Sequence, residues 1–435
     1  MAAKPPRSIR FRDALLLTQD ASRTIRRGDL TVVDGKIDAV GPSRTPVEET
    51  IDARGYALLP GFVNAHTHVA MSLLRGFADD RDLGGFLERL FAVDARRTPA
   101  DIEAGAAAGI AEMLLGGTTS FLDLYYGEEA VARAVERLGV RGFLGWAVLD
   151  PELTTQKGKP LENARSFIRS WKRHPLVTPL VAPQGVYVCN EETWLGARAL
   201  AQEEATFCHY HLSETRREVH ELEAKTGLRP PLWLEKIGFL AAGDVAAHGV
   251  WLTQREVDTL GKHRVGVVHC PSSNLKLATG GVCPVPELRS SGVVVGLGTD
   301  SNASNNALSM LREMREAGLM QKQHRWDASV LPAGTLFDMA TIEGARLLGR
   351  EKELGSLEAG KQADLVLLRL DHPTLVPARP ENIVSHLAYS ASEEAIDSVF
   401  VRGEKVVEHR NLVRAPWDEI RNAAERAAET FWSPR

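Results

Sequence analysis

The chain has 435 residues, too many for one small hydrophobic core, and this length fits a large α/β domain with an accessory domain. With 44% hydrophobic and 25% charged residues, the composition is that of an ordinary globular protein. The net charge is −5, from 52 basic and 57 acidic residues without a long basic block, which argues against nucleic acid or an anionic membrane as the main partner. We therefore expect a small-molecule substrate.

The apolar segments of the chain are short. No stretch approaches the roughly 20 apolar residues that a membrane-spanning helix needs, and residues 14–17 are too few for the core of a signal peptide. The four cysteines form no C-x-x-C pair, which predicts reduced thiols instead of a disulfide framework or a thiolate metal site. Together these features predict a cytoplasmic protein.

Both ends of the chain consist of short strand-like segments separated by turn sequences such as Asp34-Gly35. An alanine-rich stretch at 417–431 carries charges at helical spacing and predicts a terminal helix. We expect one small β-sandwich built from both termini, covering residues 1–59 plus 356–435 and including this helix. Its strands are predicted at residues 14–17, 30–33, 36–40, 56–59, 364–368, 396–401 and 405–408.

The middle of the chain, residues 60–355, alternates short apolar strands with longer amphipathic segments, which is typical of βα units around a parallel sheet. Eight such units in this length predict a (β/α)₈ barrel of the TIM type. The strands are expected at residues 62–68, 120–124, 142–148, 177–183, 206–211, 245–248, 265–269 and 293–300. Helices are expected at residues 99–115, 130–138, 191–203, 216–225, 255–262 and 307–322.

Polar residues stand at the ends of these apolar strands, where a barrel of this kind gathers its chemistry. His66 and His68 end the first strand and alternate onto one face, so that both can bind one metal ion. Burying several imidazoles and a carboxylate at one end of a barrel is costly unless a metal or a substrate satisfies them. The other polar residues in such positions are Gln184, His211, His248, His269 and Asp300.

Three further features of these strand ends bear on chemistry. Glu214 follows His211 by three residues, where its carboxylate can reach a substrate or simply favour the dipole of the next helix. His209 alternates onto the face of His211 but one layer deeper, so we assign it to packing or to support of the site. Asp300 ends the eighth strand, where it can contact a metal and accept a proton from water.

These motifs resemble the amidohydrolase superfamily and, within it, the cytosine-deaminase-like branch that contains the 5-methylthioadenosine/S-adenosylhomocysteine deaminase family. The resemblance runs in family order from about residue 14 to 410 and implies a metal-dependent barrel with a composite β-sandwich. The matching segments are residues 60–68, 73–76, 211–215, 247–250, 269–277, 298–300, 303–306 and 355–365.

The resemblance also implies roles for the strand-end residues. Glu214 and His248 match the proton-handling pair of the family, and Asp300 matches a third catalytic group. Gln184 stands near the end of the fourth strand and supplies no lysine for a second metal, so one divalent ion per chain is expected, zinc first and iron(II) as the alternative. The residues that match the metal ligands are His66, His68, His211 and Asp300.

The implied reaction is hydrolytic deamination, in which Asp300 with His248 takes a proton from water and Glu214 protonates the substrate ring. The first candidate substrates are adenine-type nucleosides such as methylthioadenosine, S-adenosylhomocysteine or adenosine. The alternatives are an aminodeoxyfutalosine-like nucleoside and another heterocycle of the guanine, pterin or s-triazine kind, the last with deamination or dechlorination. A non-catalytic scaffold is disfavoured by the complete set of site residues.

Substrate contacts are predicted at Asp94, Trp146, Lys159, Gln184, Arg75 and His269. By resemblance, Asp94 would bind the ribose hydroxyls, with a one-residue gap, and Gln184 stands where the family commonly has a histidine. Trp146 can be simple packing or can stack on an aryl or purine group. Lys159 or Arg75 can meet an anionic tail. Family analogy also favours a homo-oligomer.

Overall fold

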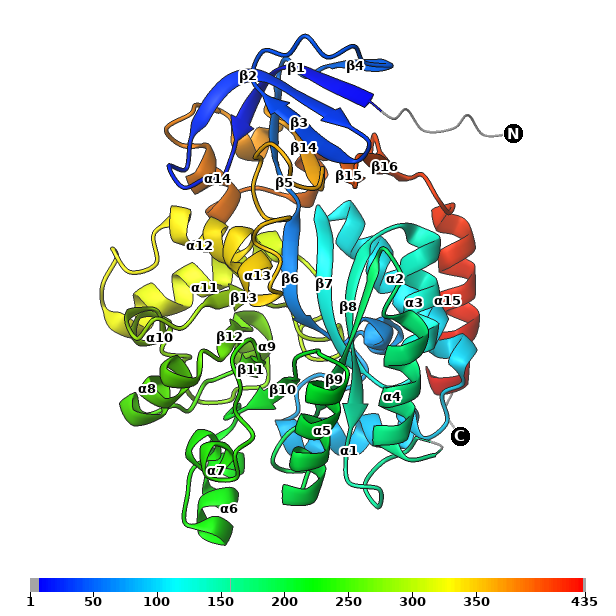
Figure 1. The fold of residues 1–435 in the computed structure, drawn as a ribbon, viewed down its shortest axis with the longest axis vertical. Helices are drawn as coiled ribbons and strands as arrows, with labels where there is room; N and C mark the ends of the chain where they lie inside the picture. Colours follow the sequence, from blue (N-terminus) through cyan, green and yellow to red (C-terminus); the bar gives the residue numbers. More distant parts are fainter. Residues whose placement is uncertain (1–7, 157, 433–435) are drawn as a thin grey trace.

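A closed barrel of eight parallel strands forms the middle of the protein in the computed structural model, which describes residues 8–156 and 158–432 (Figure 1). Four strands pair in each half, and parallel bridges between Val181 and Cys208 and between Thr67 and Asp300 join the halves. The predicted (β/α)₈ barrel is confirmed. Its strands are β6 (Phe62–Thr67), β7 (Thr118–Tyr125), β8 (Arg141–Val148), β9 (Val177–Pro183), β10 (His209–Leu212), β11 (Val245–His248), β12 (Gly266–His269) and β13 (Val295–Leu297).

Helices surround the barrel, and their ends follow local sequence rules. Thr98 and Asp101 form a capping box at the start of α2, and Gly117 with a φ of +81° follows its end. Among the described residues, no helix is both long and apolar enough to cross a membrane. The helices of the barrel region are η1 (Val69–Leu74), α1 (Leu83–Asp94), α2 (Pro99–Leu115), α3 (Glu128–Leu138), α4 (Pro160–Trp171), α5 (Glu191–Glu203), α6 (Arg216–Thr226), α7 (Pro230–Lys236), α8 (Gln254–His263), α9 (Pro271–Lys276), α10 (Val285–Ser290), α11 (Met310–Arg325), α12 (Ala333–Met339) and α13 (Ile342–Leu347).

Apolar side chains fill the barrel on the side where its strands begin. They come from strands all around the barrel and pack in one cluster with Leu347 of α13, so the cluster lies inside. The opposite end, at the carboxyl ends of the strands, is thereby left for polar residues. The cluster includes Val63, Leu122, Phe143, Leu180, Val245 and Val268.

Strands from both termini form the β-rich domain, as predicted (Figure 1). They make one nine-stranded sheet in which β5 joins the N-terminal strand β1 to the C-terminal strand β14. The rings of Phe11 in β1 and Phe400 in β15 lie 5.1 Å apart although two strands separate them, so the sheet curls around a core. The strands are β1 (Ser8–Leu17), β2 (Ile25–Val33), β3 (Lys36–Val40), β4 (Glu49–Asp52), β5 (Tyr56–Pro60), β14 (Leu365–Arg369), β15 (Ile396–Val401), β16 (Glu404–Glu408) and β17 (Asn411–Leu412). The short helices η2 (Pro373–Leu375), α14 (Ile383–Tyr389) and η3 (Glu393–Ala395) connect β14 to β15.

The terminal helix α15 (Trp417–Trp432) leaves the sheet and packs beside α2 on the barrel (Figure 1). At its end the Trp432 indole donates a 3.0 Å hydrogen bond to the Leu73 carbonyl and meets the Phe77 ring at 5.2 Å. The division into residues 60–355 and residues 1–59 plus 356–435 stays a proposal, with this helix returning to the barrel. Residues 1–7 and 433–435 of that division lie outside the described residues.

A buried ion pair joins the barrel to the sheet. Arg141 at the start of β8 and Asp364 before β14 lie 3.3 Å apart, each with a side chain only 5% exposed. Arg141→Leu should lower the free energy of unfolding by about 3 kcal/mol or more, because Asp364 would stay buried without its cation. Chemical denaturation measures this loss. Arg217→Leu, which breaks the exposed pair with Glu221 on α6, is the matched control and should cost less than about 1 kcal/mol. Equal losses in the two variants would contradict the prediction.

Candidate active site

A cavity opens at the carboxyl ends of the barrel strands and encloses about 790 Å³, including the part open to solvent. Polar residues from four strand ends form its floor, namely His68, His211, His248 and Asp300, with Glu214 beside them. Helix α1 and the segment after β8 form the walls.

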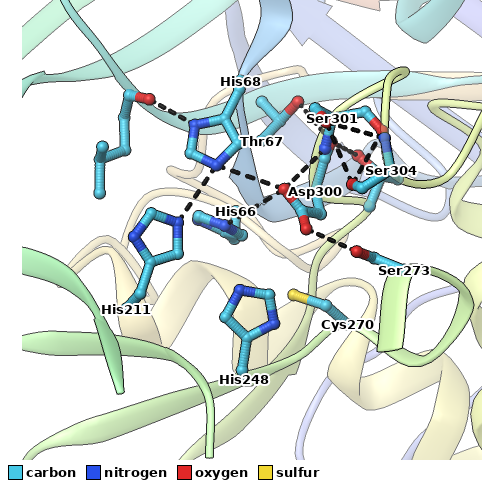
Figure 2. A network of polar contacts seen from close by, with 12 residues as sticks. His66, Thr67, His68, His211, His248, Cys270, Ser273, Asp300, Ser301 and Ser304 are labelled. Carbon is cyan, nitrogen blue, oxygen red and sulfur yellow. Dashed lines mark hydrogen bonds and ion pairs between the residues drawn. The ribbon is translucent and has the colours of Figure 1, made fainter. Parts of the chain in front are cut away.

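Figure 2 shows the three histidines predicted as metal ligands close to Asp300. Each of them engages Nδ1 in a hydrogen bond. His68 Nδ1 donates to the Leu124 carbonyl, and His211 Nδ1 donates to the Gln184 carbonyl at 2.6 Å. His66 Nδ1 lies 2.8 Å from Nε2 of His209. Because a carbonyl oxygen only accepts, Nδ1 of His68 and His211 must carry the hydrogen, and their Nε2 atoms keep a free lone pair.

These Nε2 atoms point toward one another and toward Asp300. His211 Nε2 lies 3.2 Å from His68 Nε2, and Asp300 Oδ1 lies 3.3 Å from His68 Nε2 and 3.8 Å from His66 Nε2. His66 Nε2 is buried and has no hydrogen-bond partner. Two lone pairs facing each other at 3.2 Å repel unless a cation lies between them. His66, His68 and His211 form one group of possible metal ligands, and His66, His248 and Asp300 form a second that shares His66. Imidazole nitrogens and carboxylate oxygens are donors that fit a divalent metal ion such as zinc.

Burial and neighbouring charges determine the protonation of the donor groups. Burial lowers the pKa of His66 well below its usual value, which keeps the ring neutral. Burial alone would raise the pKa of Asp300, but the hydrogen bond and charge of a protonated His68 outweigh it and lower the pKa, so the carboxylate is ionised. His68 must release this Nε2 proton before it can bind a metal ion. Asp300 is also held in place, because Oδ1 accepts a 2.8 Å hydrogen bond from the Ser301 amide and Oδ2 a 2.6 Å bond from the Ser273 hydroxyl.

His248 and Glu214 form a second group beside the histidine cluster. His248 Nε2 lies 3.8 Å from Glu214 Oε2, and the Asn274 amide donates a 3.1 Å hydrogen bond to His248 Nδ1. The ring hydrogen of His248 is therefore on Nε2, facing Glu214. Burial lowers the pKa of His248 to about 4, so the ring is neutral. Burial, with the neighbouring Asp300 charge, raises the pKa of Glu214 well above its usual value, which favours the protonated acid.

The backbone is strained where these residues leave their strands. Ser213, His248 and Asp300 have φ values of +49°, +76° and +57°, in a region that residues other than glycine rarely adopt. Such strain persists only where surrounding structure holds it, and it gathers at functional sites. Two of these three residues, His248 and Asp300, line the cavity.

Two of the predicted substrate contacts line the cavity, namely Asp94 and Gln184. Asp94 ends α1, and its Oδ1 accepts a 2.5 Å hydrogen bond from the Tyr125 hydroxyl. Arg97 donates to the same hydroxyl at 2.7 Å and to the Ala70 carbonyl at 2.6 Å. The Asp94 carboxylate is therefore fixed to η1, which follows His68, and to the end of β7.

Trp146 and His269, also predicted as substrate contacts, are not in the cavity wall. The Trp146 indole donates a 2.8 Å hydrogen bond to Gln156 Oε1, and its ring packs against Phe167 of α4. Trp146 therefore packs between the barrel and α4 and does not stack on a substrate from the cavity wall. His269 is fully buried behind the cavity, and neither ring nitrogen has a hydrogen-bond partner.

Arg75 and Lys159, the predicted partners of an anionic tail, also lie away from the cavity. Arg75 pairs with Glu112 of α2 at 2.5 Å. Lys159 precedes α4 with a side chain 76% exposed and lies 3.2 Å from Glu162. Both cations are thus neutralised on the outside of the barrel. Sequence spacing cannot show this, because it does not reveal toward which side a loop residue points.

Sequence reasoning missed the apolar wall that α1 adds to the cavity. Among the described residues that line the cavity, none is a lysine or an arginine. The apolar residues of 83–91 recur at helical spacing, which was the one available indication of a buried helix face. The wall consists of Leu83, Phe86, Leu87, Leu90 and Phe91, with Leu149 and Leu153 from the segment after β8.

The fold and this cluster define a class, the (β/α)₈-barrel hydrolases with a histidine and aspartate metal site. The chain belongs to the amidohydrolase family, whose profile matches residues 57–406. A 5-methylthioadenosine/S-adenosylhomocysteine deaminase of Thermodesulfovibrio yellowstonii is 41% identical over 404 residues, covering 90% of this chain and 91% of that protein.

Two further relatives are similar over nearly their whole length. A 5′-deoxyadenosine deaminase of Methanothermobacter thermautotrophicus is 39% identical, covering 93% of this chain and 95% of that protein. The crystal structure of an adenosine deaminase from Xanthomonas campestris with bound zinc superimposes with a TM-score of 0.93 at 32% identity, covering 97% of this chain and 98% of that one. That structure contains zinc, and this chain has a cluster of histidines and an aspartate that could hold a metal ion.

Proposed function

We propose that this protein is a metal-dependent deaminase that hydrolyses the amino group from the adenine ring of a nucleoside. The observation that carries the proposal is that three histidine Nε2 atoms gather in one buried cluster, two of them 3.8 and 3.3 Å from the Asp300 carboxylate, beside a neutral His248 and a buried Glu214. The deaminase names of the relatives support the same reaction. A small molecule is the proposed partner, and a homo-oligomer stays a prediction.

One divalent ion is proposed as the cofactor, held by the Nε2 atoms of three histidines and by Asp300. Zinc is the first choice because the donors are imidazole and carboxylate and because the Xanthomonas structure contains it, with iron(II) as the alternative. When bound, such an ion lowers the pKa of water and so supplies a nucleophile at neutral pH. The histidine ligands are His66, His68 and His211.

The residues around this site divide the proton transfers. Asp300 is ionised and accepts the proton of the attacking water, while the Nε2–H of His248 orients that water. Glu214, kept protonated by its burial, donates to the ring nitrogen next to the carbon under attack, so that charge is neutralised as it develops. Asp300 then passes its proton to the departing amino group, which leaves as ammonia, and the second proton of the water, released as the carbonyl forms, restores the acid form of Glu214.

Glu214→Gln tests this assignment, because glutamine keeps the shape of the side chain and cannot donate the acid proton. Ammonia release from an adenine nucleoside should fall roughly 100- to 10,000-fold, the usual contribution of a positioned acid, while zinc content stays at the native level. Glu221→Gln on the exposed face of α6 is the matched control and should keep the native rate. A near-native rate for Glu214→Gln in metal-loaded protein would refute the assignment.

The cavity also restricts the 5′ substituent of the nucleoside. If the adenine amino group lies at the metal site, Asp94 lies farther from the metal, because Tyr125 stands between His68 and Asp94. The preceding turns of α1 place Leu90, Leu87 and Leu83 in the cavity wall beyond Asp94. Asp94 is placed to bind the ribose hydroxyls, and the leucines to contact the 5′ group. Among the described residues no lysine or arginine lines this wall, so an amino acid tail would find no cationic partner in this part of the cavity. We propose a small uncharged 5′ substituent, as in methylthioadenosine or 5′-deoxyadenosine.

Steady-state kinetics on a nucleoside series tests this preference. The value of kcat/KM for methylthioadenosine and 5′-deoxyadenosine should exceed that for S-adenosylhomocysteine by roughly tenfold or more, because an unpaired buried polar group costs about 1–3 kcal/mol. Adenosine, with a 5′ hydroxyl, is the common reference. Equal or better turnover of S-adenosylhomocysteine would contradict an uncharged 5′ subsite and leave the deaminase assignment intact.

A further inference from the structure

We propose that His209 is a positioning residue for the metal site, which orients the His66 ring and determines which of its nitrogens is free to bind metal. His209 lies on β10 two residues before His211 and is fully buried. It is absent from the cavity wall, so it touches neither substrate nor reacting atoms. The inference rests on the proposed metal site.

A chain of two hydrogen bonds fixes the hydrogens of both rings. His209 Nδ1 lies 2.8 Å from the Val245 carbonyl oxygen, which only accepts, so this nitrogen carries the hydrogen. In the neutral ring, Nε2 of His209 is then an acceptor. Its 2.8 Å contact with His66 Nδ1 therefore requires the hydrogen to be on His66 Nδ1. His66 Nε2 is left with a lone pair and faces Asp300.

The other two histidines of the cluster are fixed in a different way. His68 and His211 donate to backbone carbonyl oxygens, which no substitution removes. His66 instead depends on a side chain from a strand on another part of the barrel, which itself depends on the carbonyl of β11. The tautomer of His66 is thus under the control of one replaceable residue.

The partner of a metal-binding histidine usually contributes tenfold to a hundredfold to metal affinity. Without His209, the hydrogen of His66 can move to Nε2, which blocks metal binding, or Nδ1–H is left buried without an acceptor. Either change opposes metal binding. Loss of packing alone would instead weaken the metal-free and metal-bound protein equally.

Zinc affinity of metal-free protein, measured by competition with a chelating dye, tests the proposal with three variants. His209→Leu removes the acceptor and should weaken zinc binding about 10- to 100-fold. His209→Gln can accept from His66 through its amide oxygen and donate to Val245 through its amide nitrogen, so it should restore most of the affinity. Tyr210→Phe is the matched control, because it deletes a buried, unpartnered hydroxyl on the same strand and should bind zinc as the native protein does.

Thermal unfolding with and without zinc separates positioning from packing. The increase in Tm on adding zinc should be smaller in His209→Leu than in the native protein, because stabilisation by a ligand follows its affinity. Native zinc affinity in His209→Leu, or equal losses in the Leu and Gln variants, would overturn the proposal and leave the deaminase function standing. If the native protein itself bound no zinc, both this inference and the metal-dependent function would fail.

Discussion

The arrangement of the site depends on one electrostatic constraint, the approach of three imidazole lone pairs to a carboxylate in a buried space. His211 and His68 bring their Nε2 atoms to 3.2 Å, and Asp300 stands 3.3 Å from His68. A cation between these atoms turns the repulsion of the lone pairs into coordination. The barrel imposes the geometry, because main-chain carbonyl groups hold Nδ1 of His68 and His211 while the His209 ring contacts Nδ1 of His66.

Metal binding and proton transfer are assigned to different sides of the same cavity. The ligand side is fixed by hydrogen bonds that set the tautomers, whereas the proton-handling side is set by burial. His248 stays neutral and directs its Nε2–H at Glu214, whose burial favours the protonated form. Asp300 is assigned to both sides, because it is a proposed metal ligand and also the proposed proton acceptor. Hydrogen bonds from Ser273 and Ser301 hold its two oxygens. Backbone strain at His248 and Asp300 is consistent with this shared geometry.

Much of this architecture could be predicted from the sequence because it depends on the regular spacing of apolar and polar residues along strands and helices. The spacing of the strands indicated eight βα units, and alternation placed His66 and His68 on one face. The predicted substrate contacts that lie outside the cavity depend on loop conformation and on side-chain direction. Trp146, predicted from its place near a strand end, packs against α4 and not in the cavity wall. Lys159, predicted to meet an anionic tail, is exposed beside α4. The apolar wall from α1 arises from how residues 83–94 fold back over the barrel, which spacing alone does not encode.

We propose that one metal ion binds between the three Nε2 atoms and Asp300. An anomalous difference map from crystals of the zinc-loaded protein, recorded at the zinc absorption edge, would locate this ion. We expect a single peak at about 2.0–2.2 Å from Nε2 of His66, His68 and His211 and from one Asp300 oxygen. A peak elsewhere, a second peak of equal height in the cavity, or coordination through Nδ1 would contradict it.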